Sequence, residues 1–324
     1  MSIDLPTAGL VAAPNDLARL SVAAMIDGYA SGTITPSEVT EAVIAAIDRA
    51  DAKLKIVVTP LYDQARAAAA QATADWKAGR PAGPLAGVPI SVKDLIYVGG
   101  VAAKAGAPGL DGFVAPTDAA VVERIRAAGA IVTCKTTTCE SGYKLTADSP
   151  VSGITRNPWN PSRTSGGSSG GAAAGVAAGC GPLALGTDGV GSIRVPSAFC
   201  GVVGIKPTFG LVPRSPGFSP PSWASLAHTG PIARSVADAA ALLSVIAGPD
   251  IRDPACLPAT GGSYSAGIRS LKGSRSPPRS TSATRRSIRT CGRPSPRRST
   301  CSAGSAPACA RMRSACRPTC WRRR

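Results

Sequence analysis

The sequence has a single histidine, few aromatic residues and no long apolar run. Because His228 is alone, a metal site built from several histidines is excluded. Aromatic residues make up only 4% of the chain, whereas Gly (36) and Pro (29) are abundant, which favours an α/β protein over an all-β sandwich. No apolar segment approaches the roughly 20 residues that a transmembrane helix needs. We therefore expect a cytoplasmic protein that makes no membrane contact.

Acidic residues are absent after Asp253, although the whole chain carries a net charge of +17. Residues 269–324 contain 15 Arg, one Lys and no acid, which leaves 20 basic and 19 acidic residues in 1–268. The body of the protein is therefore nearly neutral. A basic surface for nucleic acid is not expected there.

Residues 269–324 form a tail rich in Arg, Ser, Pro and Cys, without helical or strand periodicity. Such a composition is typical of a disordered basic arm, of an arginine-rich RNA-binding segment, or of a GC-rich gene translated out of frame. The abrupt change near residue 270 favours the last interpretation. Cys316 and Cys320 have a spacing close to that of metal ligands, but no histidine or second tight pair accompanies them, so we expect no metal. The widely spaced cysteines of the body are expected to be reduced thiols.

Periodicity and capping signals predict alternating helices and strands in the body, residues 1–268. Helices are expected at 16–32, 36–47, 61–77, 117–128, 172–178 and 235–247, and strands at 88–92, 130–136 and 182–188. The second helix has the clearest start, with Thr35 as N-cap and Glu38 completing a capping box. Strand-helix-strand alternation predicts an α/β sheet. Residues 145–171 and the Pro/Ser-rich stretch around His228 are predicted to be loops.

Two Gly/Ser-rich clusters, residues 164–175 and 186–197, dominate the candidate chemistry. Glycines around a serine allow backbone N–H groups to converge on an anion while the hydroxyl stays accessible. Neither cluster has the ending of a phosphate-binding P-loop, so a nucleotide site is not favoured. A serine nucleophile needs a base, and the candidates are His228 and Lys93. Lys93 ends an apolar strand, where burial would lower its pKa, but a surface lysine paired with Asp94 remains an equal alternative.

Three motifs, in this order, resemble those of the amidase signature family: GVPISVKD, SRTSGGSSGGAAAGVAAG and PLALGTDGVGSIRVPSAFCGVVGIKPT. The resemblance extends from the N-terminal helices to about Pro254. It implies an α/β/α sandwich with a mixed central sheet, here incomplete at the C-terminus because the family domain continues beyond the start of the tail. It also implies hydrolysis of a small-molecule amide without a metal or other cofactor.

The resemblance further implies a Ser-cisSer-Lys triad. Ser192 would be the nucleophile, Ser168 the bridging serine after a cis peptide bond, and Lys93 the base. The oxyanion would be held by the backbone N–H groups of Gly189, Val190 and Gly191. Supporting roles would fall to Ser169, a neighbour of the bridge, and to Asp188 and Arg194, an ion pair that shapes the turn.

One departure from the family pattern and two alternatives accompany this interpretation. Val190 stands where the family usually has glycine, and a β-branched residue would distort the oxyanion loop if that position required a positive φ. One alternative is the glutaminase subunit of a tRNA-dependent amidotransferase, which needs partner subunits. The other is an inactive remnant whose basic tail binds nucleic acid. The sequence leaves the oligomeric state open, with a homodimer among the options.

Overall fold

The computed structural model describes residues 16–217, 226–258 and 263–264. The tail and its Cys316/Cys320 pair lie outside the described residues, so the division of the chain at residue 268 stays a prediction. In chain order the elements are η1 (Leu17–Arg19), α1 (Val22–Ser31), α2 (Pro36–Leu54), β1 (Val57–Pro60), α3 (Tyr62–Lys77), β2 (Pro89–Lys93), η2 (Pro108–Leu110), α4 (Ala120–Ala127), β3 (Ile131–Thr136), η3 (Glu140–Gly142), β4 (Asp148–Ser149), β5 (Gly153–Ile154), β6 (Arg156–Asn157), β7 (Asn160–Thr164), α5 (Gly170–Ala178), β8 (Leu183–Asp188), α6 (Arg194–Cys200), β9 (Val203–Gly204), β10 (His228–Ala233) and α7 (Val236–Ile246).

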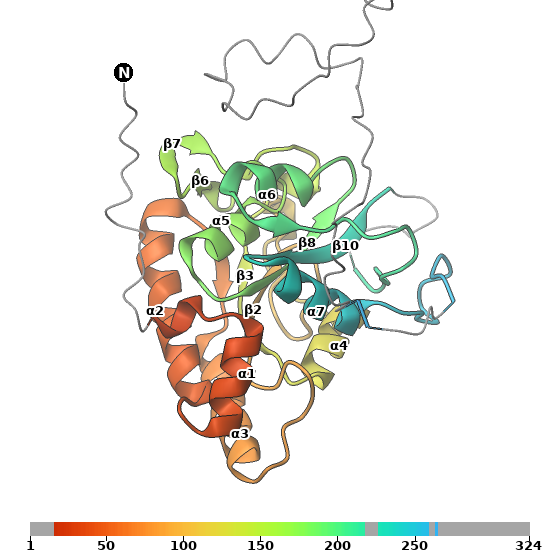
Figure 1. Ribbon diagram of the computed structural model, residues 1–324. Helices are drawn as coiled ribbons and strands as arrows, with labels where there is room; N and C mark the ends of the chain where they lie inside the picture. The colour runs from red at the N-terminus through yellow and green to blue at the C-terminus, as the bar shows by residue number, and fades with distance from the viewer. Residues whose placement is uncertain (1–15, 218–225, 259–262, 265–324) are drawn as a thin grey trace, which may run out of the picture. The chain divides into compact units, whose positions relative to one another are not determined.

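A six-stranded mixed sheet lies at the centre of the described chain, with the strand order β1-β3-β2-β8-β10-β9 (Figure 1). Strand β2 pairs in parallel with both β3 and β8, whereas β1, β10 and β9 pair antiparallel to their neighbours. Helix α4 provides the crossover from β2 to β3 that a parallel pair requires. The predicted α/β class with a mixed sheet is therefore confirmed.

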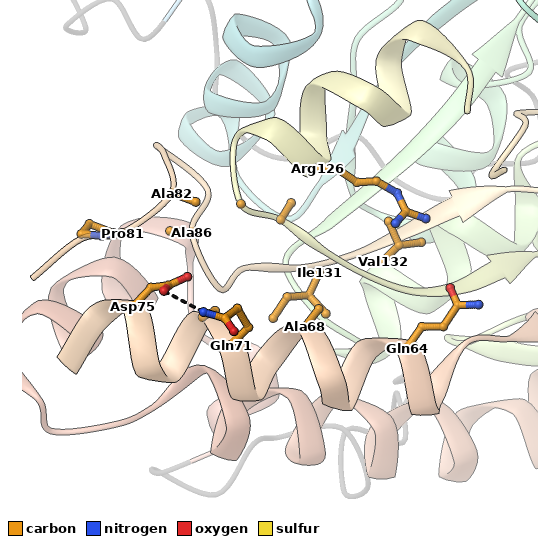
Figure 2. A pocket seen from close by; sticks show the side chains of 13 residues that line it. Gln64, Ala68, Gln71, Asp75, Pro81, Ala82, Ala86, Arg126, Ile131 and Val132 are labelled. Atoms are coloured by element: carbon orange, nitrogen blue, oxygen red, sulfur yellow. Dashed lines mark hydrogen bonds between the residues drawn. The ribbon is translucent and has the colours of Figure 1, made fainter. Parts of the chain in front are cut away.

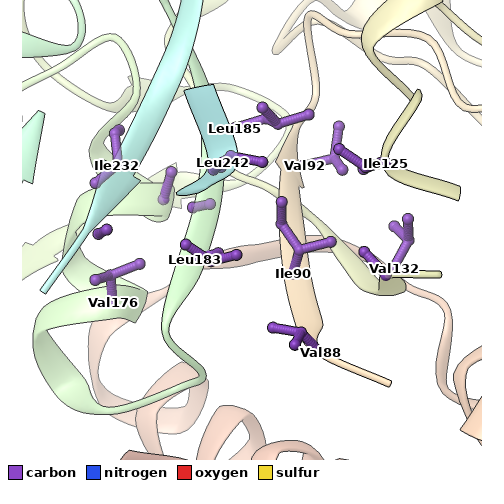
Figure 3. Packing of buried hydrophobic residues seen from close by; sticks show 14 of the residues in the cluster. Val88, Ile90, Val92, Ile125, Val132, Val176, Leu183, Leu185, Ile232 and Leu242 are labelled. Atoms are coloured by element: carbon purple, nitrogen blue, oxygen red, sulfur yellow. The ribbon is translucent and has the colours of Figure 1, made fainter. Parts of the chain in front are cut away.

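Helices cover both faces of this sheet (Figure 1). On one face α5 packs against β2, β8 and β10 and against α2, and on the other α7 packs against β8 and β10 and against α4. Ile90 and Val92 of β2 belong to the same buried cluster as Ile125 of α4 and Leu242 of α7 (Figure 3). Because side chains alternate along a strand, Lys93 points to the other face, where the start of α5 lies.

The helix boundaries follow the capping residues. Helix α2 begins with the predicted capping box, in which the Thr35 side chain accepts from the backbone of Glu38 and the Glu38 carboxylate accepts from the backbone of Thr35. The single helix expected at 16–32 is wrong, because a short 3-10 turn comes first and the Ser21 side chain then caps α1 by accepting from Ala24 N at 3.2 Å.

The helix expected from residue 117 begins only at Ala120. The residues predicted to form its first turn make contacts with other parts of the chain instead. The Asp118 carboxylate accepts a hydrogen bond from Gly99 N at 2.6 Å and pairs with Arg126 at 3.1 Å. A carboxylate so engaged is not available to cap the helix locally.

Two segments predicted to be loops contain strands. Within 145–171 the chain forms two small antiparallel pairs, β4 with β5 and β6 with β7. The stretch that begins at His228 is β10, which pairs along its whole length with β8. Its Gly230 and Pro231 are poor strand formers, so pairing with two neighbours decides the conformation against local propensity.

Neither a membrane-crossing helix nor a disulfide is found in the described part of the chain. No helix there is both long and apolar enough to cross a bilayer. The thiols of the body are free, as expected: Cys134, Cys139, Cys180, Cys200 and Cys256.

A fully buried ion pair joins the ends of β2 and β3. Lys135 Nζ lies 3.0 Å from Asp94 Oδ1, and both side chains are 0% exposed. Burial raises the pKa of Asp94, while Lys135 and the backbone N–H groups of Ala105 and Lys104 act in the opposite direction. Burial likewise lowers the pKa of Lys135, and Asp94 opposes this. Each charge is therefore tolerated inside the protein because the other is present.

The Lys135→Met variant tests this dependence. It leaves the Asp94 carboxylate buried without its cation, so we expect the free energy of unfolding in urea to fall by about 3–5 kcal/mol. The double variant Lys135→Met/Asp94→Leu removes both charges and should recover most of that loss. A loss below about 1 kcal/mol in the single variant would show that the buried Asp94 carboxylate does not depend on Lys135.

Candidate active site

The side chain of Lys93 is fully buried and ends among three hydroxyl groups. Its Nζ lies 2.7 Å from Ser168 Oγ, 2.9 Å from Ser169 Oγ and 2.8 Å from Thr187 Oγ1. The lysine comes from the end of β2, the two serines precede α5, and the threonine is near the end of β8. The sheet thus brings three distant parts of the sequence to one point.

Burial lowers the pKa of Lys93 to about 7, while the charge of Asp188 acts in the opposite direction. No carboxylate among the described residues lies within ion-pair distance of its Nζ. The alternative of a surface lysine paired with Asp94 is wrong, because Asp94 pairs with Lys135. An uncharged amine is therefore well populated near neutral pH, as a lysine base requires.

Ser168 and Ser169 have different roles in the architecture. The peptide bond between Gly167 and Ser168 is cis, as the family resemblance implies. Ser169 fastens the start of α5 to β8, because its Oγ accepts from Thr187 N at 3.2 Å and donates to Thr187 O at 3.1 Å. Its backbone N–H donates to Ser192 O at 3.1 Å, which places the main chain of Ser192 beside the two serines.

Helix α5 reaches this position because its first two residues are glycines, which carry no side chains. A Cβ atom added at Gly170 would collide with Ala147 and Ser165. One added at Gly171 would collide with Thr137 and would lie 2.7 Å from the carbonyl oxygen of Ile56. Glycine at both positions therefore lets the helix start lie directly against the neighbouring backbone.

The turn between β8 and α6 is organised by the carboxylate of Asp188. Asp188 Oδ1 accepts from Gly191 N at 2.7 Å, and Oδ2 accepts from Ile193 N and Arg194 N, each at 3.2 Å. The expected ion pair is present, with Arg194 Nε 2.9 Å from Asp188 Oδ2. Burial alone would raise the pKa of Asp188, but these hydrogen bonds outweigh it and hold the pKa at about 2. The carboxylate thus stays ionised and fixes the turn.

The three residues before Ser192 differ in what they contribute to this turn. Gly191 has φ +136°, which only glycine adopts readily, and its N–H already donates to Asp188. Val190 is not among the residues with positive φ, so its β-branched side chain does not strain the loop. That side chain is 72% exposed. The distortion considered for Val190 required a positive φ, and this loop does not need one there. The N–H groups of Gly189 and Val190 are the better candidates to bind an oxyanion, because that of Gly191 is already engaged.

Ser192 is buried, and its Oγ makes no hydrogen bond to another described residue. The structure thus joins Lys93 directly to Ser168, while Ser192 is placed beside them through its backbone contact with Ser169. Catalytic hydrogen bonds often tighten only around a substrate, so this geometry is compatible with a relay through Ser168.

His228 does not join this cluster. It lies at the start of β10, where its Nδ1 is 3.2 Å from the carbonyl oxygen of Asp188 and its ring contacts Phe209 edge-on. Burial lowers the pKa of His228, with a backbone contact to Asp188 acting in the opposite direction. No hydrogen bond from this ring to a serine is present in the described part of the chain, so Lys93 is the better base.

A cavity of about 250 Å³ lies elsewhere, between α3, the end of α4 and β3 (Figure 2). Its polar groups are Arg126, Gln64 and the hydrogen-bonded pair Gln71 and Asp75, at 2.9 Å. It contains neither a serine nor a lysine. We therefore assign no catalytic chemistry to it.

Sequence reasoning missed two contributors to the site. The Thr187 hydroxyl contacts Lys93 directly, and Gly142 of the η3 turn is so close to Ser168 that an added Cβ would lie 3.4 Å from its Oγ. Thr187 comes just before the carboxyl end of its strand, so a prediction that this strand runs parallel to the one ending at Lys93 would have found the contact. No local signal marks the turn, whose Ser141 has a left-handed φ of +50°.

The family model named Amidase matches residues 38–276. An acylamidase from Rhodococcus erythropolis is 42% identical over 235 residues, covering 72% of this chain and 49% of that protein. A glutamyl-tRNA(Gln) amidotransferase subunit from Chloroflexus aurantiacus is 43% identical over 243 residues, covering 75% of this chain and 50% of that protein. The chain thus spans about half the length of these relatives.

Solved structures of amidases also resemble this chain. The peptide amidase from Stenotrophomonas maltophilia superposes with a TM-score of 0.72 at 38% identity, covering 78% of this chain and 52% of that one. A bacterial aryl acylamidase of the amidase signature family superposes with a TM-score of 0.69 at 38% identity, covering 74% and 50%. With sequence, fold and the arrangement of Lys93 and Ser168 in agreement, the chain belongs to the amidase signature family.

Proposed function

We propose that this chain carries the nucleophile and the base of an amidase, which hydrolyses a carboxylic amide to an acid and ammonia or an amine. The observation that carries the proposal is the fully buried Lys93 amine 2.7 Å from Ser168 Oγ, with no carboxylate of the described residues within ion-pair distance. The names of its relatives, acylamidase, aryl acylamidase and peptide amidase, support this reaction class.

Hydrogen-bond counting supports the direction of proton transfer. A neutral amine has two N–H donors and one lone pair. Because Ser169 Oγ donates its own proton to Thr187 O, it must accept from Lys93. One N–H and the lone pair then remain for Ser168 and Thr187. If Thr187 accepts the second N–H, the Ser168 hydroxyl donates to the lone pair, and Lys93 is positioned to take the Ser168 proton.

The reaction then proceeds through an acyl-enzyme. Lys93 takes the proton of Ser168, and Ser168 takes that of Ser192 as Ser192 Oγ bonds to the amide carbon. The carbon–nitrogen bond breaks after the nitrogen receives the proton back through the same relay. Water, deprotonated in the same way, releases the acid and restores Ser192. In the first step Lys93 becomes an ammonium that can donate to all three hydroxyls around it.

The oxyanion formed in this reaction would be bound by the N–H groups of Gly189 and Val190. Removing one such donor typically costs about 3–4 kcal/mol of transition-state stabilisation. The ionised Asp188 contributes by holding the turn through Gly191, Ile193 and Arg194. It acts on the position of the donors and not on the substrate.

A second candidate function is the release of ammonia from glutamine for a partner protein. The 43% identity to a glutamyl-tRNA(Gln) amidotransferase subunit favours it. Ammonia release should be measured on glutamine and on simple aliphatic and aryl amides. Turnover of glutamine alone would favour the amidotransferase function, and turnover of the simple amides would favour the amidase.

Substitution of the triad tests the proposed chemistry. Ser192→Ala, Ser168→Ala and Lys93→Ala should each lower amide hydrolysis to background, because each removes one part of the relay. Ammonia release is the measurement, and circular dichroism checks folding. The matched control is Ser162→Ala, at an exposed position outside the site. Retained turnover in Ser192→Ala would eliminate the nucleophile assignment.

The pH dependence tests the base. Because the neutral amine is the active form and its pKa is about 7, kcat/KM should rise through that pH and level off above it. Lys93 should also make stability increase with pH between its folded pKa and its ordinary value of 10.5, since the unfolded chain binds the extra proton in that window. Urea unfolding of Lys93→Met should lack this increase. Activity that falls as pH rises through 7 would contradict a lysine base.

A further inference from the structure

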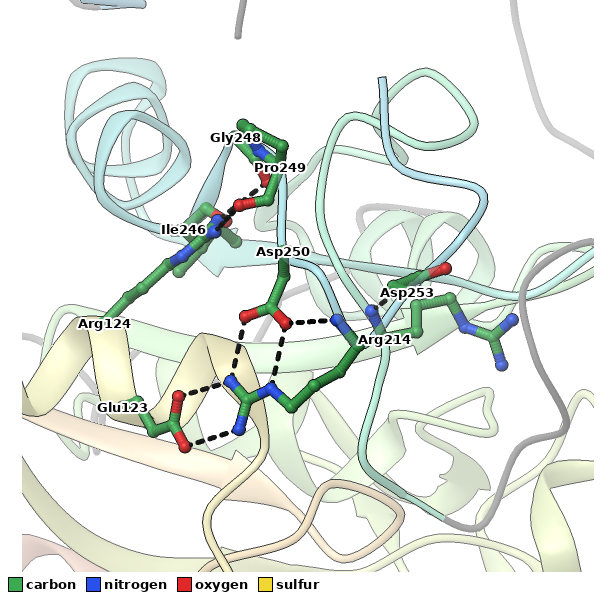
Figure 4. Close-up of polar contacts among 9 residues, drawn as sticks. Glu123, Arg124, Arg214, Ile246, Gly248, Pro249, Asp250 and Asp253 are labelled. Atoms are coloured by element: carbon green, nitrogen blue, oxygen red, sulfur yellow. Dashed lines mark hydrogen bonds and ion pairs between the residues drawn. The ribbon is translucent and has the colours of Figure 1, made fainter. Parts of the chain in front are cut away.

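The guanidinium nitrogens Nη1 and Nη2 of Arg214 have no hydrogen-bond partner in the described structure, unlike the guanidinium groups of Arg124 and Arg252. The backbone N–H of Arg214 donates to Asp253 Oδ2 at 2.9 Å, but Nη1 and Nη2 are closed off from solvent and make no hydrogen bond in the described structure. Nearby, Arg124 donates to three backbone carbonyls, and Arg252 is paired with Glu123 and Asp250 (Figure 4). Figure 4 shows the Arg214 guanidinium directed away from all of these groups.

An arginine in this position demands an anion. Arginine stays protonated at any pH at which the protein is folded, so burial cannot be relieved by loss of the proton. Burial lowers the pKa of Arg214, and the charge of Asp253 acts in the opposite direction. The two Asp253 oxygens, however, accept from the backbone of Arg214 and Ala255. Nη1 and Nη2 therefore present N–H donors that a planar oxyanion would satisfy.

Arg214 is one of the residues that line a small cavity next to the reactive cluster. The cavity has a volume of about 20 Å³, and Arg214, Thr187, Thr229 and Leu95 are among the residues that line it. Thr187 also contacts the reactive cluster, because its Oγ1 lies 2.8 Å from Lys93 Nζ, so the cavity and the catalytic hydroxyls share this residue. Such a volume admits one water or one small group. Any ligand there is the end of a molecule whose remainder lies elsewhere.

We propose that Arg214 is a carboxylate-binding residue of the active site, which selects amides that carry a carboxylate a few bonds from the scissile bond. This inference rests on the proposed amidase function. The planar fork of a guanidinium matches a carboxylate through two parallel hydrogen bonds. The substrate would thus be held at two points, with its carbonyl at Ser192 and its carboxylate at Arg214, and Thr187, which contacts both regions, would lie beside the chain that joins them.

Two amides of equal length test the proposal. Succinamate and butyramide differ only in that a carboxylate replaces a methyl group. We expect kcat/KM to favour succinamate by about tenfold or more, the effect of a charge-assisted hydrogen-bond pair. Arg214→Met should reduce this preference at least tenfold, and Arg214→Lys should retain part of it. The control Arg163→Met removes an exposed positive charge and should leave the preference as it is. Equal kcat/KM values for both amides in the unmodified protein would overturn the proposal.

Direct binding separates this inference from the proposed reaction. In the Ser192→Ala background, calorimetry should give a dissociation constant about tenfold or more lower for succinamate than for butyramide, and adding Arg214→Met should remove the difference. Selective succinamate binding without any hydrolysis in the Ser192-containing chain would support the Arg214 site and refute the amidase proposal. Acetate distinguishes a substrate carboxylate from a free small anion. If acetate binds as tightly as succinamate, Arg214 does not select substrates and the proposal is wrong.

Discussion

A fully buried amine surrounded by hydroxyl groups is the constraint on which the site depends. Two lysines at the ends of adjacent strands are fully buried, and their partners decide what each can do. Lys135 has Asp94 at 3.0 Å, so its charge is compensated and it holds the structure together. Among the described residues, Lys93 has hydroxyl groups within hydrogen-bond distance and no carboxylate, and a hydroxyl can either accept or donate a hydrogen bond. Burial is thus compensated by an opposite charge at Lys135, whereas at Lys93 it lowers the pKa of the amine.

The fold places the hydroxyls around that amine by backbone contacts. Parallel strands β2 and β8 end at the same edge of the sheet, and α5 starts there because Ser169 hydrogen-bonds both backbone groups of Thr187. The following turn is drawn in by Asp188, whose carboxylate collects three backbone N–H groups. Each of these contacts joins a short side chain, a serine hydroxyl or an aspartate carboxylate, to the backbone, so the geometry is set largely before any substrate enters.

Much of this arrangement could be read from the sequence, because its signals are local or belong to long motifs. The capping box at Thr35 and the apolar strand before Lys93 depend on neighbouring residues only, and both were predicted correctly. Strand β10 and the late start of α4 were missed because distant partners decide them: β8 pairs with Pro231 and its neighbours, and Gly99 takes the Asp118 carboxylate. The contact of Thr187 with Lys93 was missed for the same reason, since it exists only once two strands lie side by side.

The two glycines at the start of α5 limit which substitutions this part of the protein can tolerate. Any side chain at Gly171 would push the helix away from Thr137 and carry Ser168 and Ser169 with it. A substitution at Gly171 would therefore displace both serines of the site. The two turns that flank the serines are open to change. Tyr143 is 90% exposed and Val190 72%, so the side chains at these two positions lie largely in solvent. Substitutions in these turns should therefore be tolerated far better than any substitution at the glycine start of the helix.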